Sequence, residues 1–164
     1  MKERGQFFVW DAPAPVGTKQ QNRRILLVED NADDVDLTLR AFSRSQCTHE
    51  IVVVRDGVEA LDYLFATGSH AGRAPAGAPA VVLLDIQLPK LDGLEVLRRL
   101  RADDRTRHLP VVVLTSSTEE SDIIRSYDLG ANSFVRKPVD FEQFLVAAAH
   151  LGLYWLVLNQ PSPA

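Results

Sequence analysis

The chain has 164 residues, of which 46% are apolar and 24% are charged, so its composition is that of a soluble globular protein of one domain plus tails. The net charge of -4 argues against broad non-specific binding to nucleic acid, which needs a basic surface. A single cysteine, Cys47, cannot form an internal disulfide, so a reducing compartment such as the cytoplasm fits. The opening MKERGQFFVWDAPAPVG has no apolar run long enough for a signal peptide.

Residues 1–22 are expected to form a flexible N-terminal arm, because they mix Pro, Gly and polar residues without a hydrophobic period. The FFVW cluster at 7–10 interrupts this pattern. It would either pack on the domain or a partner, or remain a disordered apolar tag. Residues 23–159 are expected to form one domain, and 160–164 a C-terminal tail.

From residue 23, five short apolar runs alternate with helical stretches. The runs are RRILLVED, IVVV, AVVLLD, PVVVLTSS and SFVRKP, and continuous Val/Ile/Leu runs of this length fit parallel strands buried on both faces. Helices are expected over 33–44, 57–67, 93–101, 119–129 and from Asp140 onward. Five strand-helix units in strict alternation predict an α/β fold, a doubly wound five-stranded parallel sheet with helices on both faces.

The ends of the predicted strands carry the residues that matter for chemistry, because ligands of open α/β sheets bind at the carboxyl ends of the strands. Four of the five strands end there in charged or reactive residues: Glu29 and Asp30, Asp85, Thr115, and Lys137. Three converging carboxylates repel each other, and an all-oxygen site selects a hard cation such as Mg²⁺. With a lysine and a threonine hydroxyl beside it, this set can support phosphoryl transfer to a carboxylate. Each residue alone could be an ordinary helix cap, but the full set at one rim favours a site.

The motifs LLVEDN, LLDIQLPKLDG, VVLTSS and SFVRKP, in that order, closely resemble the response-regulator receiver family over residues 23–158. The resemblance implies the flavodoxin-like receiver fold. It also implies that Asp85 accepts a phosphoryl group from a phosphohistidine on a sensor histidine kinase, in a two-component phosphorelay. The protein would then be a switch that dephosphorylates itself, and not an enzyme acting on another substrate.

The resemblance also implies a Mg²⁺ site. Asp30 and Asp85 would ligate the ion directly, Glu29 would act mainly through water, and Gln87 would contribute its backbone carbonyl. The family usually carries Asp in the place of Glu29, so the longer side chain would shift the metal slightly. Gly93 suits a backbone position where a side chain would clash.

Three further residues take switch roles by the same resemblance. Thr115 would bond a phosphoryl oxygen after transfer, and Lys137 would pair with the phosphoryl group. Phe134, three residues before Lys137, occupies the position of the family's aromatic switch, and its alternative is plain strand packing. Gln87 and Ser117 would flank the path of the hydrolytic water, and we hypothesise that they set the lifetime of the phosphorylated state.

The last predicted helix is apolar nearly all round, with the sequence FLVAAAHLGLYWLVL at 144–158. A membrane span would need roughly 20 such residues, so a span is discounted. One apolar side of this helix should pack on the sheet, and the other apolar side needs a partner that buries it. We predict a homodimer that uses Tyr127, Leu151, Tyr154 and Trp155, with the FFVW arm as the alternative cover.

VEDN at 28–31, ANSFVRKP at 131–138 and the LYW ending at 153–155 together resemble the small stand-alone regulators paired with bacterial phytochromes, which would make a light-sensing histidine kinase the partner. Nothing after residue 159 could hold a DNA-binding or catalytic output domain, so signalling is expected to pass through a surface. Neither nucleic acid nor a membrane is an expected partner. A basic run (Arg98, Arg99, Arg101, Arg105, Arg107) is most simply a solvated helix face.

Three alternatives remain open. A Mg²⁺-dependent phosphohydrolase with an aspartyl nucleophile usually needs a second acid near the nucleophile and a cap domain, but Gln87 lies two residues after Asp85 and no cap insertion exists. A flavin- or nucleotide-binding module would need a phosphate loop after the first strand, where acidic residues stand instead. The third is a scaffold that never uses its phosphorylation site.

Overall fold

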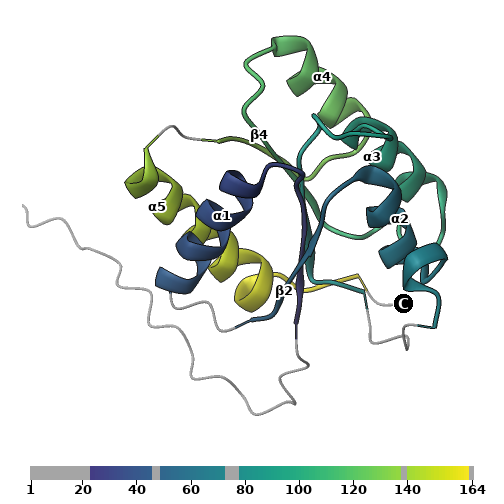
Figure 1. The fold of residues 1–164 in the computed structure, drawn as a ribbon, viewed down its shortest axis with the longest axis horizontal. Helices are drawn as coiled ribbons and strands as arrows, with labels where there is room; N and C mark the ends of the chain where they lie inside the picture. The colour runs from purple at the N-terminus through teal and green to yellow at the C-terminus, as the bar shows by residue number, and fades with distance from the viewer. Residues whose placement is uncertain (1–22, 46–48, 73–77, 138–139, 163–164) are drawn as a thin grey trace, which may run out of the picture.

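A five-stranded parallel sheet of order β2-β1-β3-β4-β5 forms the centre of the protein (Figure 1). The computed structural model describes residues 23–45, 49–72, 78–137 and 140–162. The strands are β1 (Ile25–Val28), β2 (Ile51–Val54), β3 (Val81–Leu84), β4 (Val111–Thr115) and β5 (Ser133–Arg136), and every neighbouring pair is parallel. The predicted strands and the doubly wound flavodoxin-like order are therefore confirmed. The predicted N-terminal arm, with its FFVW cluster, lies outside the described residues and stays a prediction.

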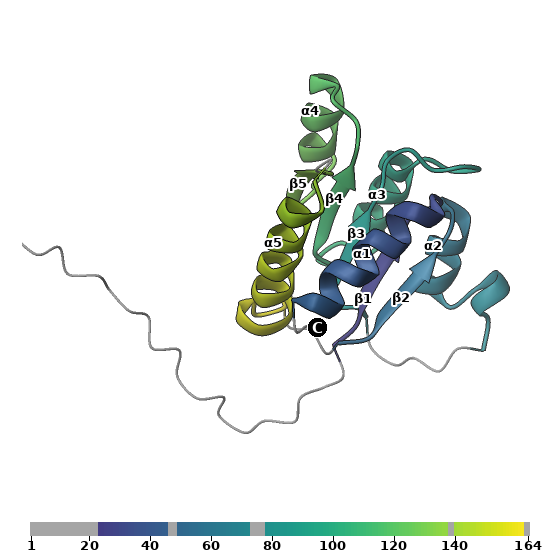
Figure 2. The same cartoon turned by 60° about the vertical axis from the view of Figure 1, so that its left-hand side comes forward.

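The helices cover both faces of the sheet. They are α1 (Ala32–Arg44), α2 (Gly57–Phe65), the short 3-10 helix η1 (Gly68–His70), α3 (Gly93–Ala102), α4 (Glu120–Asp128), α5 (Phe141–Gly152) and the π-helix η2 (Leu153–Leu158). Figures 1 and 2 show α1 and α5 side by side on one face, and α2 and α3 on the other. Helix α4 contacts the edge strand β5.

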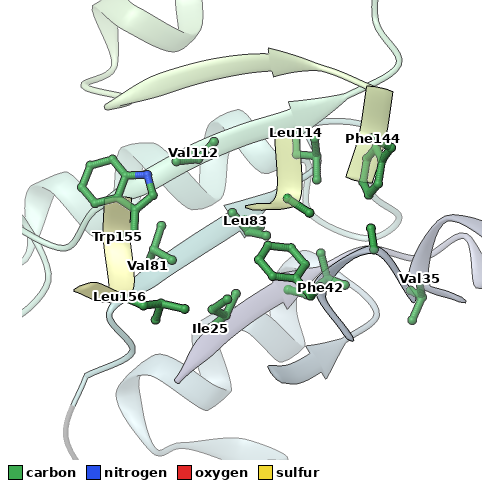
Figure 3. Packing of buried hydrophobic residues seen from close by; sticks show 13 residues of the cluster. Ile25, Val35, Phe42, Val81, Leu83, Val112, Leu114, Phe144, Trp155 and Leu156 are labelled. Carbon is green, nitrogen blue, oxygen red and sulfur yellow. The ribbon is translucent and has the colours of Figure 1, made fainter. Parts of the chain in front are cut away.

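The face under α1 and α5 holds a large apolar core (Figure 3). Alternate residues of β1, β3 and β4 point into it, and the helices contribute three large rings, Phe42, Phe144 and Trp155. The intervening strand residues point to the opposite face, where they pack against α2 and α3 through residues such as Tyr63 and Leu97. Because both faces are covered, the central strands can be apolar at every position, which explains their unbroken Val/Ile/Leu runs.

Side-chain caps fix where the helices begin. The carboxylates of Asp56, Asp92 and Asp140 accept hydrogen bonds from backbone N–H groups of the first turns of α2, α3 and α5. Asn31 does the same at α1. These residues have the ordinary capping role, whereas Asp85 caps no helix.

The end of the last helix widens into a π-helical turn. Its consecutive residues Trp155 and Leu156 are both buried, and the Arg23 guanidinium donates to the Leu156 carbonyl at 2.9 Å. The predicted interface role of Trp155 is corrected, because this ring is only 8% exposed and packs in the core.

Helices α5 and η2 together, Phe141–Leu158, are long and apolar enough to cross a membrane by length and composition. Core helices of soluble proteins pass the same test. Here Phe144, Ala148, Trp155 and Leu156 pack against the sheet. The opposite side of this helix is open, with Val146, Leu153, Tyr154, Val157 and Leu158 each at least half exposed.

Arg101 joins α3 to the connections before β4 and β5. Its guanidinium donates to the carbonyls of Gly130 at 3.0 Å and Leu109 at 2.9 Å, and to the side-chain oxygen of Asn132 at 3.1 Å. The Asn132 oxygen also accepts the N–H of Val111, the first residue of β4, at 2.9 Å. The interpretation of the whole basic run as a solvated face is therefore wrong for Arg101.

We expect Arg101→Ala to lower the free energy of unfolding by about 2 kcal/mol, because the substitution leaves partly buried carbonyls without a donor. Urea denaturation measures this change. Arg99→Ala, on the same helix, is the matched control, since Arg99 is exposed and its ion pair is with Glu95, which also binds Arg98. Equal losses in the two variants would contradict the role given to Arg101.

Candidate functional site

The carboxyl ends of β1, β3, β4 and β5 bring four predicted residues together. Glu29, Asp85 and Thr115 are 2%, 5% and 0% exposed. Lys137 follows β5, and its side chain is 8% exposed. Residues of these types are rarely so buried unless they are paired, so their mutual contacts must satisfy them.

The ammonium group of Lys137 lies at the centre of the cluster. Its Nζ donates to Asp85 Oδ2 at 2.8 Å, to Asp34 Oδ2 at 2.9 Å and to Glu29 Oε2. All three of its protons therefore have carboxylate acceptors. Asp34 was not predicted as a member of this set. It lies in the first turn of α1, and the Asn31 cap that bonds its backbone N–H fixes that turn.

The pKa values of Glu29 and Lys137 are both raised in this cluster. Burial raises the pKa of the Glu29 carboxyl to about 7, and the hydrogen bond from Lys137 opposes this rise. Burial alone would lower the pKa of Lys137, but its hydrogen bonds with Asp85, Glu29 and Asp34 outweigh that effect and raise the pKa. Lys137 is therefore charged at neutral pH.

The Asp85 carboxylate is also held from its other side. Its Oδ1 accepts the backbone N–H of Gln87 at 2.9 Å and the hydroxyl of Thr115 at 3.0 Å. With Lys137 on Oδ2, the carboxylate is fixed in one orientation by three donors. Such donors are placed to stabilise negative charge that develops on or next to this group.

Glycine is required directly behind the site. A Cβ on Gly93 would lie 2.2 Å from the backbone oxygen of Asp85, so any side chain would push the β3–α3 connection away from β3. The expected clash at this position is confirmed. The same connection is tied to α2 by Lys90, whose Nζ donates to Asp56 Oδ2 at 2.7 Å.

The donor set at the rim fits a hard cation by its chemistry. Asp30 is exposed next to Glu29, and Asp85 Oδ2 has one hydrogen-bond donor and a second lone pair. The side chain of Gln87 is also exposed, beside the site. Within the described residues, no three His, Cys, Asp or Glu side chains are already arranged to hold a metal. The reason is that Lys137 lies between the Glu29 and Asp85 carboxylates, so an ion would have to share these groups with the ammonium.

Phe134 and Ser117 lie on the side of the site that faces α4. The ring of Phe134 is half-buried against Ile86, Leu94 and Val113. Strand packing thus accounts for its present position, and its switch role stays a prediction. The Ser117 hydroxyl is turned towards α4, where it donates to Asp122 Oδ2 at 2.5 Å.

The residues predicted for the dimer interface fall in different environments. Tyr127 on α4 and Tyr154 on η2 are each 51% exposed. Leu151 is half-buried and packs against the core. Exposed apolar surface thus remains on both helices, without the contribution expected from Trp155.

Comparison with known proteins shows to which family the chain belongs. The model of the response regulator receiver domain matches residues 25–149. The chain is 45% identical to the probable methanogenesis regulatory protein FilR2 of Methanothrix harundinacea, over 85% of this chain and 88% of that protein. It is 35% identical to the response regulator Rcp1 of Synechocystis, over 80% and 88%.

Solved structures agree. The bacteriophytochrome response regulator AtBRR is 59% identical, with a TM-score of 0.68 over 84% of this chain and 98% of that one. The Mn²⁺-bound form of Rcp1 is 33% identical, with a TM-score of 0.77 over 86% and 99%. The chain therefore belongs to the response regulator receiver domain family, whose members are two-component signalling proteins that are phosphorylated on an aspartate.

Proposed function

We propose that Asp85 is the phosphorylated aspartate of this response regulator. The observation that carries the proposal is the buried Asp85 carboxylate, oriented by Lys137, Thr115 and the N–H of Gln87. An oxygen of Asp85 would attack the phosphorus of a phosphohistidine. The P–N bond breaks, its electron pair stays on the imidazole nitrogen, and an acyl phosphate forms on the aspartate.

The neighbouring donors would stabilise the added charge. Lys137 would pair with the phosphoryl oxygens, and the Thr115 hydroxyl, now on Asp85 Oδ1, would donate to a phosphoryl oxygen instead. Phe134 would report this movement as the aromatic switch. Hydrolysis of the acyl phosphate by the protein itself would end the signal, with Gln87 and Ser117 setting its lifetime.

A divalent cation, which we propose to be Mg²⁺, would neutralise charge between the rim and the phosphoryl group. Asp30 and Asp85 would ligate it directly, Glu29 would act through water, and Gln87 would add its backbone carbonyl. The oxygen donors at the rim support this, as does the Mn²⁺-bound form of the relative Rcp1. Because Glu29 is bonded to Lys137, its contact with the ion would be the weakest.

The donor of the phosphoryl group would be a sensor histidine kinase, and we infer a light-sensing bacteriophytochrome. The similarity to AtBRR, a bacteriophytochrome response regulator, supports this choice. The chain spans 98% of AtBRR and 88% of Rcp1, which fits a stand-alone regulator that signals through a surface. We expect it to act in the cytoplasm, without contact to nucleic acid or membrane.

We also propose a homodimer built on the open apolar side of α5 and η2, with Tyr154, Leu151 and, from α4, Tyr127. Five side chains on α5 and η2 that are at least half exposed support it. Several exposed apolar side chains on one helix, in contrast to single scattered ones, are typical of an interface.

Incubation with a small phosphodonor and Mg²⁺ should add the mass of one phosphoryl group to the wild-type protein and none to Asp85→Asn. Intact mass spectrometry measures both. Asp92→Asn is the matched control, because Asp92 is a nearby exposed cap, and it should be modified like the wild type. An equal mass gain in Asp85→Asn would contradict the assignment of Asp85.

Lys137→Gln should lower the free energy of unfolding at pH 8 by about 3 kcal/mol, since it leaves buried carboxylates without their cation. Burial already raises the pKa of the Glu29 carboxyl to about 7, and this variant lacks the Lys137 hydrogen bond that opposes the rise, so the folded state binds more protons than the unfolded one. Its stability is therefore retained at low pH and lost as pH rises. Urea denaturation at pH 5 and pH 8, with chelator present, should give the larger deficit at pH 8. A deficit that is the same at both pH values would contradict the ammonium's role.

Tyr154→Glu should convert the dimer to a monomer in light scattering, because it places a charge in the apolar interface. Val58→Glu is the control and should remain dimeric, because Val58 is an exposed residue of α2, on the opposite face of the sheet. Deletion of 1–22 should also leave the dimer intact. A wild type that is monomeric and associates only after that deletion would instead favour the arm as the cover of this helix, and a wild type that is monomeric with and without the arm would contradict the dimer.

A further inference from the structure

Helix α4 is attached to the sheet with little apolar support. Of its residues, only Ser126 is buried, while Ile124 and Tyr127 are 55% and 51% exposed. Its first turn also lacks a side-chain cap from Glu119. Most helices of globular proteins are held in place by an apolar face. Helix α4 therefore depends more than most on the polar contacts at its two ends.

The contact at the start of α4 is formed by Ser117 and Asp122. The Ser117 hydroxyl donates to Asp122 Oδ2 at 2.5 Å and accepts the N–H of Glu119 at 3.3 Å. Ser117 is 5% exposed, so water competes little for this bond. A hydroxyl bound to a carboxylate is among the stronger hydrogen bonds of proteins.

This contact continues to the proposed phosphorylation site. The backbone N–H of Ser117 donates to Thr115 Oγ1 at 3.3 Å, and the same Thr115 hydroxyl donates to Asp85 Oδ1 at 3.0 Å. If Thr115 Oγ1 moved to reach an oxygen of a phosphoryl group, its contact with the Ser117 N–H would change as well. A movement of Ser117 in turn strains its bond to Asp122.

The other end of α4 has a side-chain hydrogen bond to the edge strand β5. The N–H of Phe134 donates to the hydroxyl of Tyr127 at 3.2 Å. These two side-chain contacts thus link α4 to Ser117 in the β4–α4 connection and to Phe134 on β5. The proposed function assigns Phe134 to the aromatic switch and Ser117 to the lifetime of the phosphorylated state.

We propose that Asp122 is a positioning residue. Through Ser117 it holds the β4–α4 connection in the arrangement of the unphosphorylated protein, and so weakens the affinity of the site for a phosphoryl group. This inference rests on the proposed function of Asp85. By linkage, a contact that favours one arrangement opposes any ligand that favours the other.

The test is the affinity for beryllofluoride, which with Mg²⁺ imitates a phosphoryl group on a carboxylate. Asp122→Ala should bind it roughly tenfold more tightly than the wild type, the factor expected for loss of one charge-assisted hydrogen bond. Ser117→Ala should have a similar effect, and the double variant no more than either single one. Asp122→Asn keeps an acceptor and should return most of the way to the wild-type affinity.

Glu120→Ala is the matched control, because Glu120 is also an acidic residue of the first turn of α4, and it is exposed. Its affinity should stay within about twofold of the wild type, as expected for a surface charge. Amide chemical shifts of α4 in free Asp122→Ala should also move towards those of the beryllofluoride-bound wild type. Loss of stability alone would not produce this shift or tighter binding.

The outcomes separate the two proposals. If the wild type binds beryllofluoride through Asp85 and Asp122→Ala behaves like Glu120→Ala, the inference is overturned and the proposed function stands. Additive effects of Ser117→Ala and Asp122→Ala would also overturn it. No binding by the wild type would overturn both. Should Asp122→Ala fail to fold, Ser117→Ala carries the same test, since it removes the donor and keeps the charges of α4.

Discussion

The ammonium group of Lys137, bonded to Glu29, Asp34 and Asp85, is the interaction on which the rest of the site depends. Without it, acidic side chains from β1, α1 and β3 would meet at the carboxyl edge of the sheet with nothing to balance their charge. Burial makes each of these charges costly, and pairing offsets that cost. The same cation that allows the acids to be buried also lies where a phosphoryl group on Asp85 would bring new negative charge.

The site and α4 are joined by hydrogen bonds instead of an apolar core. Asp85, Thr115, Ser117 and Asp122 form a continuous series from β3 across β4 to the first turn of α4. The helices α1 and α5, in contrast, are fixed by large buried rings. Under the proposed function, phosphorylation of Asp85 would therefore reposition α4 while the central sheet and the opposite layer stay in place.

Much of the fold and of the site could be predicted from the sequence, because both depend on short-range patterns. Buried parallel strands must be apolar throughout, and their carboxyl ends must converge, so the strand-end residues were found together. Asp34 was missed because it reaches the site from a helix, where its direction depends on the Asn31 cap. Trp155 was misplaced because the last helix is apolar nearly all round, so its sequence does not distinguish the side that faces the sheet from the side that is exposed. Arg101 looked solvated in a basic run because its partner carbonyls come from distant turns.

The most direct test of the account is to locate the phosphoryl group itself. Borohydride reduces an acyl phosphate on aspartate to homoserine, and peptide mass spectrometry then reads the position of the change. After treatment with a phosphodonor and Mg²⁺, the account predicts homoserine at position 85 in the wild type. Reduction at Asp30 or Asp34 instead, or no homoserine in a protein that has gained the phosphoryl mass, would contradict it.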